Sequence, residues 1–377
     1  MPPKPLQPDP ESQAVSKDFD PLAWHRLLGT TPQPEPSLAH LEGKRLLITG
    51  AGGSIGSALA TSIAPAAATL ILLDTAETAL YDIDRDLRAL GHSPVSILGS
   101  IADPALLTDL FRTHRPEIVL HAAAYKHVPL LEQNPFAAIA NNVLGTHTLL
   151  EAAAHHQAAR LLLVSTDKAV ASHSLMGASK RLAELLCLVH PLPTTVVRLG
   201  NVLGSHGSVV PLFLHQLTQG HPLTVTHPNS RRFFLTLDQA VQAIIESLAV
   251  TGTSSLLASN LTHQIRIVDL ARHLIELHAS SSEIVFTALR PGDKLEESLI
   301  SPEEHWLPTN ASTSNLRAIQ TPAPSANRLQ SALSVLEQAI EARDLPTLLR
   351  TVQQLVPDYI PTPELLSQLP QTEVAQA

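Results

Sequence analysis

The sequence has little cysteine and few aromatic residues. Cysteine occurs once in 377 residues, as Cys187, and aromatic side chains make up 3% of the chain. One cysteine excludes an intramolecular disulfide and fits a reducing compartment, and its place in an apolar helical run predicts a core residue. Because aromatics are scarce, Ala, Leu, Ile and Val must fill the core. The hydrophobic share of 44% is enough for a large α/β domain with a smaller lobe.

Basic charge and long apolar runs are also lacking. Lys and Arg total 25 against 34 Asp and Glu, a formal net charge of −9, which argues against a nucleic-acid partner but leaves room for a local basic pocket. The longest apolar stretch, residues 59–73, contains Pro65 and is shorter than the roughly 20 residues that span a bilayer. The N-terminus shows no secretory signal. We therefore expect a cytoplasmic protein without a membrane span.

Histidine is abundant, with 19 residues, yet its spacing does not indicate a metal site. His155 and His156 are adjacent and would point in different directions from a helix, and no His-Glu-x-x-His pattern occurs. We expect scattered surface histidines and no metal.

The order of patterns along the chain predicts an α/β fold. Residues 1–40 are rich in proline and predict an extended N-terminal arm, with a short helix at 20–29 that packs on the domain. From residue 41 to 200, short apolar strands alternate with amphipathic helices, which predicts a Rossmann-type, doubly wound parallel sheet that binds NAD(P). The expected strands are 45–49, 69–73, 95–98, 118–121, 161–165 and 195–199, and the expected helices include 80–90, 106–114 and 137–156.

After residue 200 the alternation weakens. Residues 201–315 predict a smaller, C-terminal substrate-binding lobe interleaved with the sheet. Residues 316–377 predict C-terminal helices and a tail, with one or two amphipathic helices at 329–355 and a frayed end from residue 371.

A glycine loop follows the first expected strand. Gly50, Gly53 and Gly56 allow a tight turn and a close approach to a pyrophosphate at a helix N-terminus. Asp74 ends the second strand about 20 residues later, where a carboxylate can hold a ribose diol. A glycine turn followed by a helix-capping Asp is the structural alternative. Since Asp74 would repel a 2′-phosphate and Thr75 supplies no cation, NAD is favoured over NADP.

Several segments together resemble one enzyme family. The glycine spacing is similar to that of the extended, sugar-nucleotide branch of the short-chain dehydrogenase/reductase superfamily. Residues 121–129 (HAAAYKHVP), 142–146 (NVLGT), 165–170 (STDKAV) and 176–181 (MGASKR) strengthen the resemblance. Together they resemble the polysaccharide-biosynthesis (CapD-like) family of UDP-N-acetylglucosamine 4,6-dehydratases, over about residues 20–361. Long members carry an N-terminal membrane region before this catalytic part. Because this chain starts near their linker, it resembles a soluble, catalytic-only form.

The resemblance implies a lyase reaction with internal hydride recycling. UDP-N-acetylglucosamine, or a similar UDP-sugar, would be oxidised at C4, lose water across C5 and C6, and regain the hydride at C6 as a UDP-4-keto-6-deoxy sugar. Asp167 would be the acid at the C6 oxygen and Lys168 the base at C5. Thr166 or Ser165 would bond the C4 hydroxyl. A solvated charge pair at a strand end is the alternative for Asp167 and Lys168, but residues 165–170 match the family residue for residue.

The following helix carries Met176 and Lys180. Lys180 would bind the nicotinamide ribose and lower nearby pKa values through its charge. In the superfamily a tyrosine four residues before that lysine takes the hydroxyl proton, whereas Met176 cannot transfer a proton. The resemblance implies that methionine here is a variant of the long-chain dehydratases. Asp167 or a water chain is then the candidate acceptor of the C4 hydroxyl proton.

The same family pattern assigns further contacts. Arginine suits a diphosphate because its planar fork donates two hydrogen bonds, although a lone arginine is more often a surface ion-pair partner. Residues 198–205 resemble the segment that meets the sugar and diphosphate. Ser100 stands where the family has Asp, and Asp293 where it has Glu. The expected cofactor contacts are Gly50, Gly53, Ser54, Ile55, Gly56, Asp74, Ser100, Ile101, Ala122, Ala123, Ala124, Asn142 and Lys180. The expected substrate contacts are Lys126, His127, Asn201, Ser208, Val209, Thr224, Arg232, Arg290 and Asp293.

Two other functions fit the same residues. One is a nucleotide-sugar epimerase or reductase of the same fold, whose product would keep the elements of water. The other is a non-catalytic NAD(P)-binding sensor, which Met176 would permit. A homo-oligomer is expected whichever function holds, and residues 137–156 and 176–190 would form its helical interface.

Overall fold

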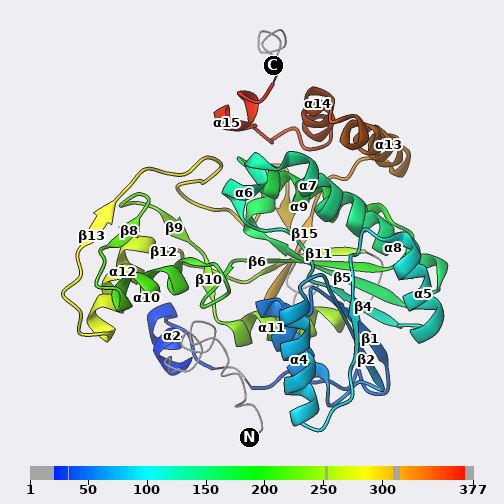
Figure 1. The fold of residues 1–377 in the computed structure, drawn as a ribbon, viewed down its shortest axis with the longest axis horizontal. Coiled ribbons are helices and arrows are strands. Elements are labelled where there is room, and N and C mark those ends of the chain that lie inside the picture. The colour runs from blue at the N-terminus through cyan, green and yellow to red at the C-terminus, as the bar shows by residue number, and fades with distance from the viewer. Residues whose placement is uncertain (1–20, 33, 251–253, 309–314, 370–377) are drawn as a thin grey trace, which may run out of the picture.

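The computed structural model describes residues 21–32, 34–250, 254–308 and 315–369, and it is built on a nine-stranded sheet (Figure 1). The strand order is β14-β15-β11-β6-β5-β4-β1-β2-β3, and every neighbouring pair from β11 to β3 is parallel. The strands are β1 Arg45–Thr49, β2 Thr69–Asp74, β3 Val95–Leu98, β4 Ile118–His121, β5 Arg160–Thr166, β6 Thr194–Leu199, β11 Ser255–Ser259, β14 His305–Trp306 and β15 Leu316–Gln320. The predicted Rossmann-type fold is confirmed.

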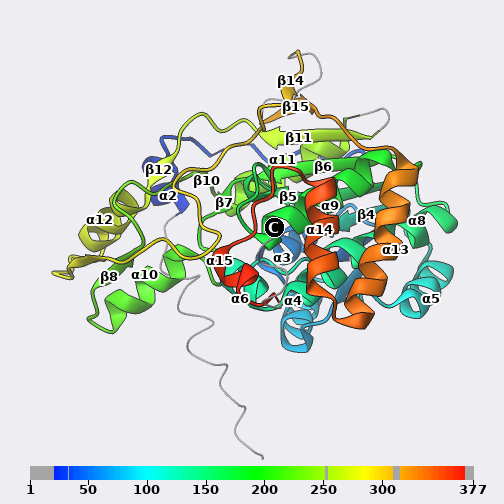
Figure 2. The ribbon, with the colours of Figure 1, turned by 90° about the horizontal axis from the view of Figure 1, so that it is seen from above.

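Helices cover both faces of the sheet, which is why its central strands are continuous apolar runs. One face packs against α3 (Ser54–Ile63), α4 (Glu77–Ala89) and α11 (Leu237–Leu248). The other packs against α5 (Pro104–His114), α8 (Gly145–His155) and α9 (Leu175–Val189). Two C-terminal helices, α13 (Ala326–Ala342) and α14 (Leu345–Leu355), extend this second layer side by side (Figure 2).

The strand order reverses at β1. From β1 the chain adds β2 and β3 on one side, and then crosses to β4, β5 and β6 on the other. Open α/β sheets bind ligands beyond the carboxyl ends of the strands at such a point, because the loops on either side diverge and leave a crevice. The loops that follow β1 and β4 flank this crevice here.

The helix expected at 137–156 is interrupted by a wider turn. It consists of α7 (Pro135–Ile139), a π-helical turn η1 (Ala140–Leu144) and α8, and it is preceded by α6 (Val128–Gln133). A π turn inserts one extra residue and often lies at a functional site. The hydrophobic period does not reveal it, because the apolar positions still fall on the buried face.

A smaller lobe lies beside the carboxyl edge of the sheet (Figure 1). It contains α10 (Val209–Thr218) and α12 (Ile267–Leu277) and three two-stranded ladders. The ladders pair β7 (Asn201–Val202) with β10 (Phe234–Leu235), β9 (Arg231–Arg232) with β12 (Ile265–Arg266), and β8 (Leu223–Val225) with β13 (Ile284–Phe286).

The expected N-terminal helix is α2 (Pro21–Leu28), and it packs on this lobe, where Trp24 joins the cluster around Phe213. The chain re-enters the sheet at β11 and, after the lobe, at the antiparallel strands β14 and β15, which the sequence did not predict. A last short helix, α15 (Pro363–Leu366), follows α14.

The expected arm before residue 21 and the end from residue 371 lie outside the described residues, and the division at residues 40, 200 and 315 stays a prediction. Within the described part of the chain, no helix combines the length and the apolar character needed to cross a membrane.

Candidate active site

The glycine loop between β1 and α3 is packed so closely that side chains are excluded. Gly50 has a φ of +70°, and a Cβ there would lie 2.6 Å from the backbone nitrogen of Ala123. A Cβ on Gly56 would collide with the carbonyl oxygen of Gly50. The loop therefore packs directly against the segment after β4, and the first turn of α3 packs against the loop. Such a cradle fits a pyrophosphate, which needs exposed backbone N–H groups at a helix N-terminus.

A Gly50→Ala variant should lose NAD binding, because its methyl group forces the loop away from Ala123. Gly91→Ala is the matched control, since Gly91 also has a positive φ, +89°, but nothing lies within 4 Å of a Cβ there. Both variants incur the left-handed penalty of roughly 1 kcal/mol. Only the first should raise the Kd for NAD in a calorimetric titration. Equal Kd values would contradict the role of the loop.

Asp74, the carboxylate expected to hold a ribose, also fixes the backbone of the glycine loop. Its Oδ2 accepts the Gly52 N–H at 2.8 Å, and its Oδ1 accepts the Ala76 N–H at 2.9 Å. The carboxylate is thereby fixed at the end of β2. Nearby, Ser100 Oγ accepts the Ala102 N–H at 3.1 Å, and Ile101 is buried against Gly145. The adenine contact expected of these two residues stays a prediction.

The segment after β4 is held by a buried amide. Asn142, in the π turn, accepts the Tyr125 N–H at 2.8 Å and donates to the Tyr125 carbonyl and to Ser179 Oγ, both at 3.0 Å. These bonds fix the backbone just before Lys126. Ala122, Ala123 and Ala124 begin this segment, and the Ala122 N–H donates to the Thr49 carbonyl at 3.0 Å. Asn142 therefore positions the loop, and its expected contact with the cofactor stays a prediction.

Asp167 and Lys168 are in direct contact at the end of β5. They form a 3₁₀ turn, η2 (Asp167–Ala169), and Lys168 Nζ lies 2.9 Å from Asp167 Oδ1. Thr166 Oγ1 donates to the same carboxylate oxygen at 2.9 Å. Asp167 has no exposed surface, so this is not the solvated strand-end pair of the alternative interpretation. Asn201 on β7 accepts from Lys168 Nζ at 2.6 Å, which joins the lobe to the pair.

The pKa of Lys168 is raised above its ordinary value. Burial lowers this pKa, but the negative charges of Asp167 and Glu297 raise it by more. Lys168 is consequently an ammonium in this state. Glu297, which the sequence did not single out, is buried and lies 2.7 Å from Lys294 Nζ, and Lys294 also donates to the Val170 carbonyl at 2.8 Å.

The helix α9, which packs against β5, carries Met176 and Lys180. Met176 is buried in the core, and Lys180 Nζ donates to the Val164 carbonyl at 2.8 Å. Burial lowers the pKa of Lys180 to about 8, although Glu184 opposes the shift. The pKa of buried His121 falls to about 3 because of burial and the charge of Lys180. The proton of Lys180 is thus easier to remove than that of an ordinary lysine.

Ser165 is not available to a substrate. Its Oγ donates to Glu184 at 2.6 Å on the buried side of β5, so of the two candidates for the C4 hydroxyl only Thr166 faces the pair. Arg198 corrects a second expectation. It belongs to the segment expected to meet the diphosphate, yet it is fully buried and bonds Glu184 and Glu304 at 2.7 and 2.6 Å. The alternation of β6 turns its side chain away from the crevice.

The remaining substrate candidates spread along the lobe. Arg232 donates to the carbonyls of Lys294 and Leu295, and Arg290 pairs with Asp293 at 2.8 Å. Ser208 and Val209 begin α10, and Thr224 is exposed and bonds Gln216. Arg290 belongs to the surroundings of His127, because burial and the charges of Lys126 and Arg290 lower the pKa of His127.

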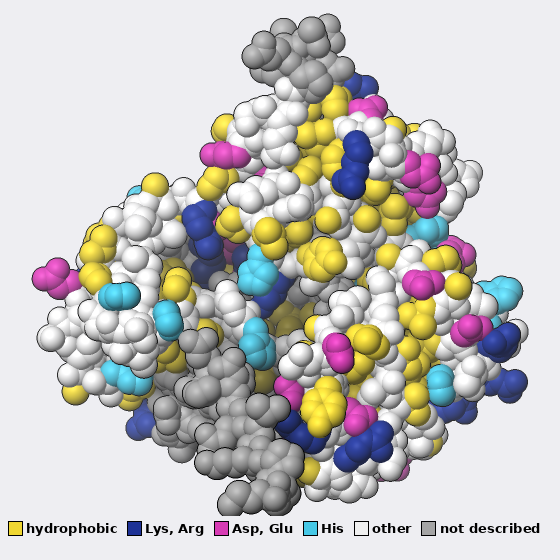
Figure 3. All heavy atoms as spheres, viewed as in Figure 1, with side chains coloured by type: hydrophobic (Ala, Val, Ile, Leu, Met, Phe, Trp, Pro, Cys, Tyr) yellow, Lys and Arg dark blue, Asp and Glu magenta, His cyan; other side chains and the backbone are white. Residues whose placement is uncertain are grey.

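This face of the molecule is hollowed between lobe and sheet, and Lys, Arg and His side chains gather along the hollow (Figure 3). In a chain of net charge −9 such a gathering concentrates positive potential where an anion can bind.

The comparisons with known proteins agree with this geometry. The model of a family described as polysaccharide biosynthesis protein matches residues 46–318. The chain belongs to this family. It is 38% identical over 276 residues to the capsular polysaccharide biosynthesis protein CapD of Staphylococcus aureus, covering 70% of this chain and 46% of CapD. The chain thus spans about half the length of that relative. The predicted family resemblance is confirmed.

Two further relatives carry nucleotide-sugar activities in their names. The UDP-glucose 4-epimerase of Rickettsia typhi is 35% identical over 274 residues, covering 69% of this chain and 79% of the epimerase. The structure of DesIV, a dTDP-glucose 4,6-dehydratase from Streptomyces venezuelae with NAD and TYD bound, has a TM-score of 0.60 and 25% identity. It covers 68% of this chain and 88% of DesIV.

Proposed function

We propose that this protein is an NAD-dependent 4,6-dehydratase of UDP-N-acetylglucosamine or a similar UDP-sugar. The observation that carries the proposal is the direct bond between the buried Asp167 carboxylate and the partly exposed Lys168 ammonium. β5, which delivers the pair, is separated from the glycine-loop strand β1 only by β4, so the acid–base pair and the cofactor loop share one edge of the sheet. Membership in the polysaccharide-biosynthesis family supports the same class of substrate.

NAD is the cofactor that the loop fits best. The glycine loop leads directly into the N-terminus of α3, which suits a pyrophosphate, and the Asp74 carboxylate lies where an adenosine ribose would be held. DesIV, which has the same fold, binds NAD. When bound, NAD would remove a hydride from C4 of the sugar and return it at C6. Asp74 would repel the extra phosphate of NADP.

The pair needs only one proton to act as both acid and base. In the resting state Lys168 is an ammonium beside the Asp167 carboxylate. Transfer of one proton along the 2.9 Å bond gives a neutral amine and a carboxylic acid. The amine then takes the C5 proton while the acid gives its proton to the departing C6 oxygen, which leaves as water. Both groups return to their resting charges. Lys168 then gives a proton to C5, and the proton released from the C4 hydroxyl restores its ammonium form.

The basic side chains of the hollow would hold the UDP diphosphate, Lys126 and Arg290 as cations and His127 as a neutral hydrogen-bond donor. Arg232 anchors the loop that carries Arg290. Thr166, beside Asp167, would bond the C4 hydroxyl. Met176 is in the core, so the proton of that hydroxyl would leave through Asp167 or water. We also expect the homo-oligomer predicted from the sequence.

An epimerase is the second candidate, favoured by the identity to the Rickettsia enzyme. An epimerase would oxidise the same carbon but would have no need for an acid at C6. The arrangement of Asp167 and Lys168, in which one group can donate while its neighbour accepts, serves elimination better.

Incubation with UDP-N-acetylglucosamine in deuterated water separates these functions. A dehydratase should yield a product that has lost water and carries deuterium at C5, as seen by mass spectrometry and NMR. A product of unchanged mass and altered C4 configuration would contradict dehydration and indicate the epimerase. NAD binding without turnover of any nucleotide sugar would indicate the sensor.

A further inference from the structure

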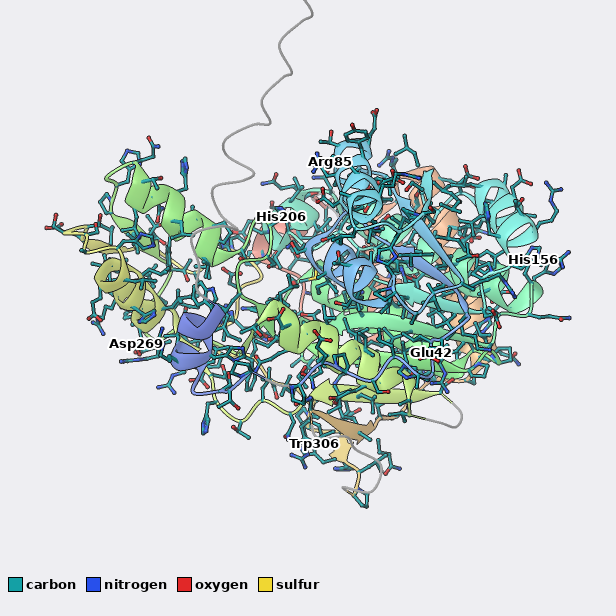
Figure 4. The ribbon with its side chains drawn as sticks, turned by 90° about the horizontal axis from the view of Figure 1, so that it is seen from below. Glu42, Arg85, His156, His206, Asp269 and Trp306 are labelled. Atoms are coloured by element: carbon teal, nitrogen blue, oxygen red, sulfur yellow. The ribbon has the colours of Figure 1, made fainter. Side chains whose placement is uncertain are left out.

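One turn of the lobe reaches across to the glycine loop. This bridging turn, residues 203–208, follows β7, and Figure 4 shows its His206 where the lobe meets the sheet domain. Ser54 is the first residue of α3. Its Oγ accepts the backbone N–H of His206 at 3.0 Å and lies 2.8 Å from the ring Nδ1. The lobe thus contacts the helix terminus at which a cofactor diphosphate would bind.

The bridging turn is also attached to the other side of the crevice. Lys126 Nζ donates to the His206 carbonyl at 2.6 Å. Gly207 has a φ of +67° and lies against the ring of His127, where a Cβ would be 2.6 Å from Cε1. Lys126 and His127 follow β4, whereas Ser54 follows β1. The turn therefore joins the two loops that flank the reversal of strand order.

We infer that His206 is a cofactor-binding residue supplied by the substrate lobe, and that Ser54 holds its ring in place to bond the NAD diphosphate. This rests on the proposal that NAD occupies the glycine loop. When the Ser54 hydroxyl donates to Nδ1, the neutral ring carries its proton on Nε2 and can donate it to a phosphate oxygen. The N-terminus of α3 adds its own partial positive charge.

The arrangement suits an enzyme whose cofactor must stay bound while hydride leaves and returns. The residues expected to bind the sugar diphosphate, Lys126 and His127, hold the backbone of the same turn that reaches Ser54. A bound nucleotide sugar would therefore tighten the turn over the cofactor. It should strengthen NAD binding, and by linkage NAD should strengthen sugar-nucleotide binding by the same factor.

Calorimetric titration of the full chain with NAD tests the inference. His206→Ala should raise the Kd about tenfold, the effect of losing one hydrogen bond to a charged group. Ser54→Ala should raise the Kd similarly. In the double variant the Kd should rise by less than the product of the two single increases. His206→Gln, which keeps an amide donor near the Nε2 position, should recover most of the affinity. His221→Ala, an exposed histidine of the same lobe, is the control and should bind NAD as the wild type does.

A second variant tests the turn without removing the ring. Gly207→Ala pushes against His127 and should also weaken NAD binding, whereas Gly204→Ala, with φ +71° and nothing within 4 Å, should do so less. If His206→Ala keeps wild-type affinity for NAD and the two substitutions act independently in the double variant, the inference is overturned. The proposed function is left intact by that result. Failure of the wild type to bind NAD would instead overturn the proposed function.

Discussion

Replacing Lys168 with alanine should lower kcat for UDP-N-acetylglucosamine by about a thousandfold, within the 10²–10⁴ range of general acid–base catalysis. The variant loses the group that takes the C5 proton and also the donor that polarises Asp167. NAD binding should persist, because Lys168 Nζ contacts Asp167 and Asn201 and not the glycine loop. Steady-state kinetics and an NAD titration of the same preparation measure the two effects separately.

Chemical rescue distinguishes a base from a structural cation. A small primary amine such as methylamine should restore part of the turnover of Lys168→Ala, increasingly so at higher pH, because only the free amine accepts a proton. Deuterium should enter C5 in the rescued reaction. Lys44→Ala, which removes an exposed lysine paired with Glu117, is the matched control and should keep wild-type kcat. Unchanged turnover in Lys168→Ala would exclude it as the base.

The sheet was predictable because its strands are short apolar runs between clear breaks. β1, β3 and β4 have the predicted bounds, β2 and β6 are one residue longer at one end, and β5 is one residue longer at each end. The antiparallel strands β14 and β15 were missed because they follow the lobe. There, strands and helices no longer alternate in a pattern that indicates a layered sheet. β15 is defined by its pairing with β11, from Leu256 opposite Ile319 to Ser259 opposite Leu316. Such long-range pairing leaves little local signal.

The site was predictable only in part, for a similar reason. That Asp167 and Lys168 touch follows from their adjacency on a tight turn, but their contact with Asn201 depends on how the lobe folds back. Register also decides which side chains face the crevice. Ser165 pairs with Arg198 across β5 and β6, and both side chains point to Glu184. Both were placed near the substrate from their motifs, because a motif does not reveal which face of a strand is buried.

Replacing Arg198 with methionine should therefore destabilise the fold and not merely weaken substrate binding. Arg198 donates to Glu184 and to Glu304, and all three side chains are almost completely buried. Removing one partner of a buried ion pair leaves uncompensated charge and costs about 3–5 kcal/mol. Urea denaturation at pH 7 should show this loss in unfolding free energy. Arg112→Ala, which breaks an exposed pair with Asp109, is the control and should leave the midpoint unchanged.

The pH dependence of this loss identifies its electrostatic origin. In the wild type, burial raises the pKa of Glu184, but Arg198 and Arg181 lower it to about 2, below the ordinary 4.5. The carboxylate therefore stabilises the wild type above pH 4.5, and this contribution is lost as pH falls toward 2. Without Arg198, burial should raise the pKa of Glu184 and Glu304, so the folded variant gains protons and stability as pH falls. The deficit should shrink between pH 7 and pH 5, and Glu184→Gln in the variant should reduce it at pH 7. A deficit independent of pH would instead indicate lost packing.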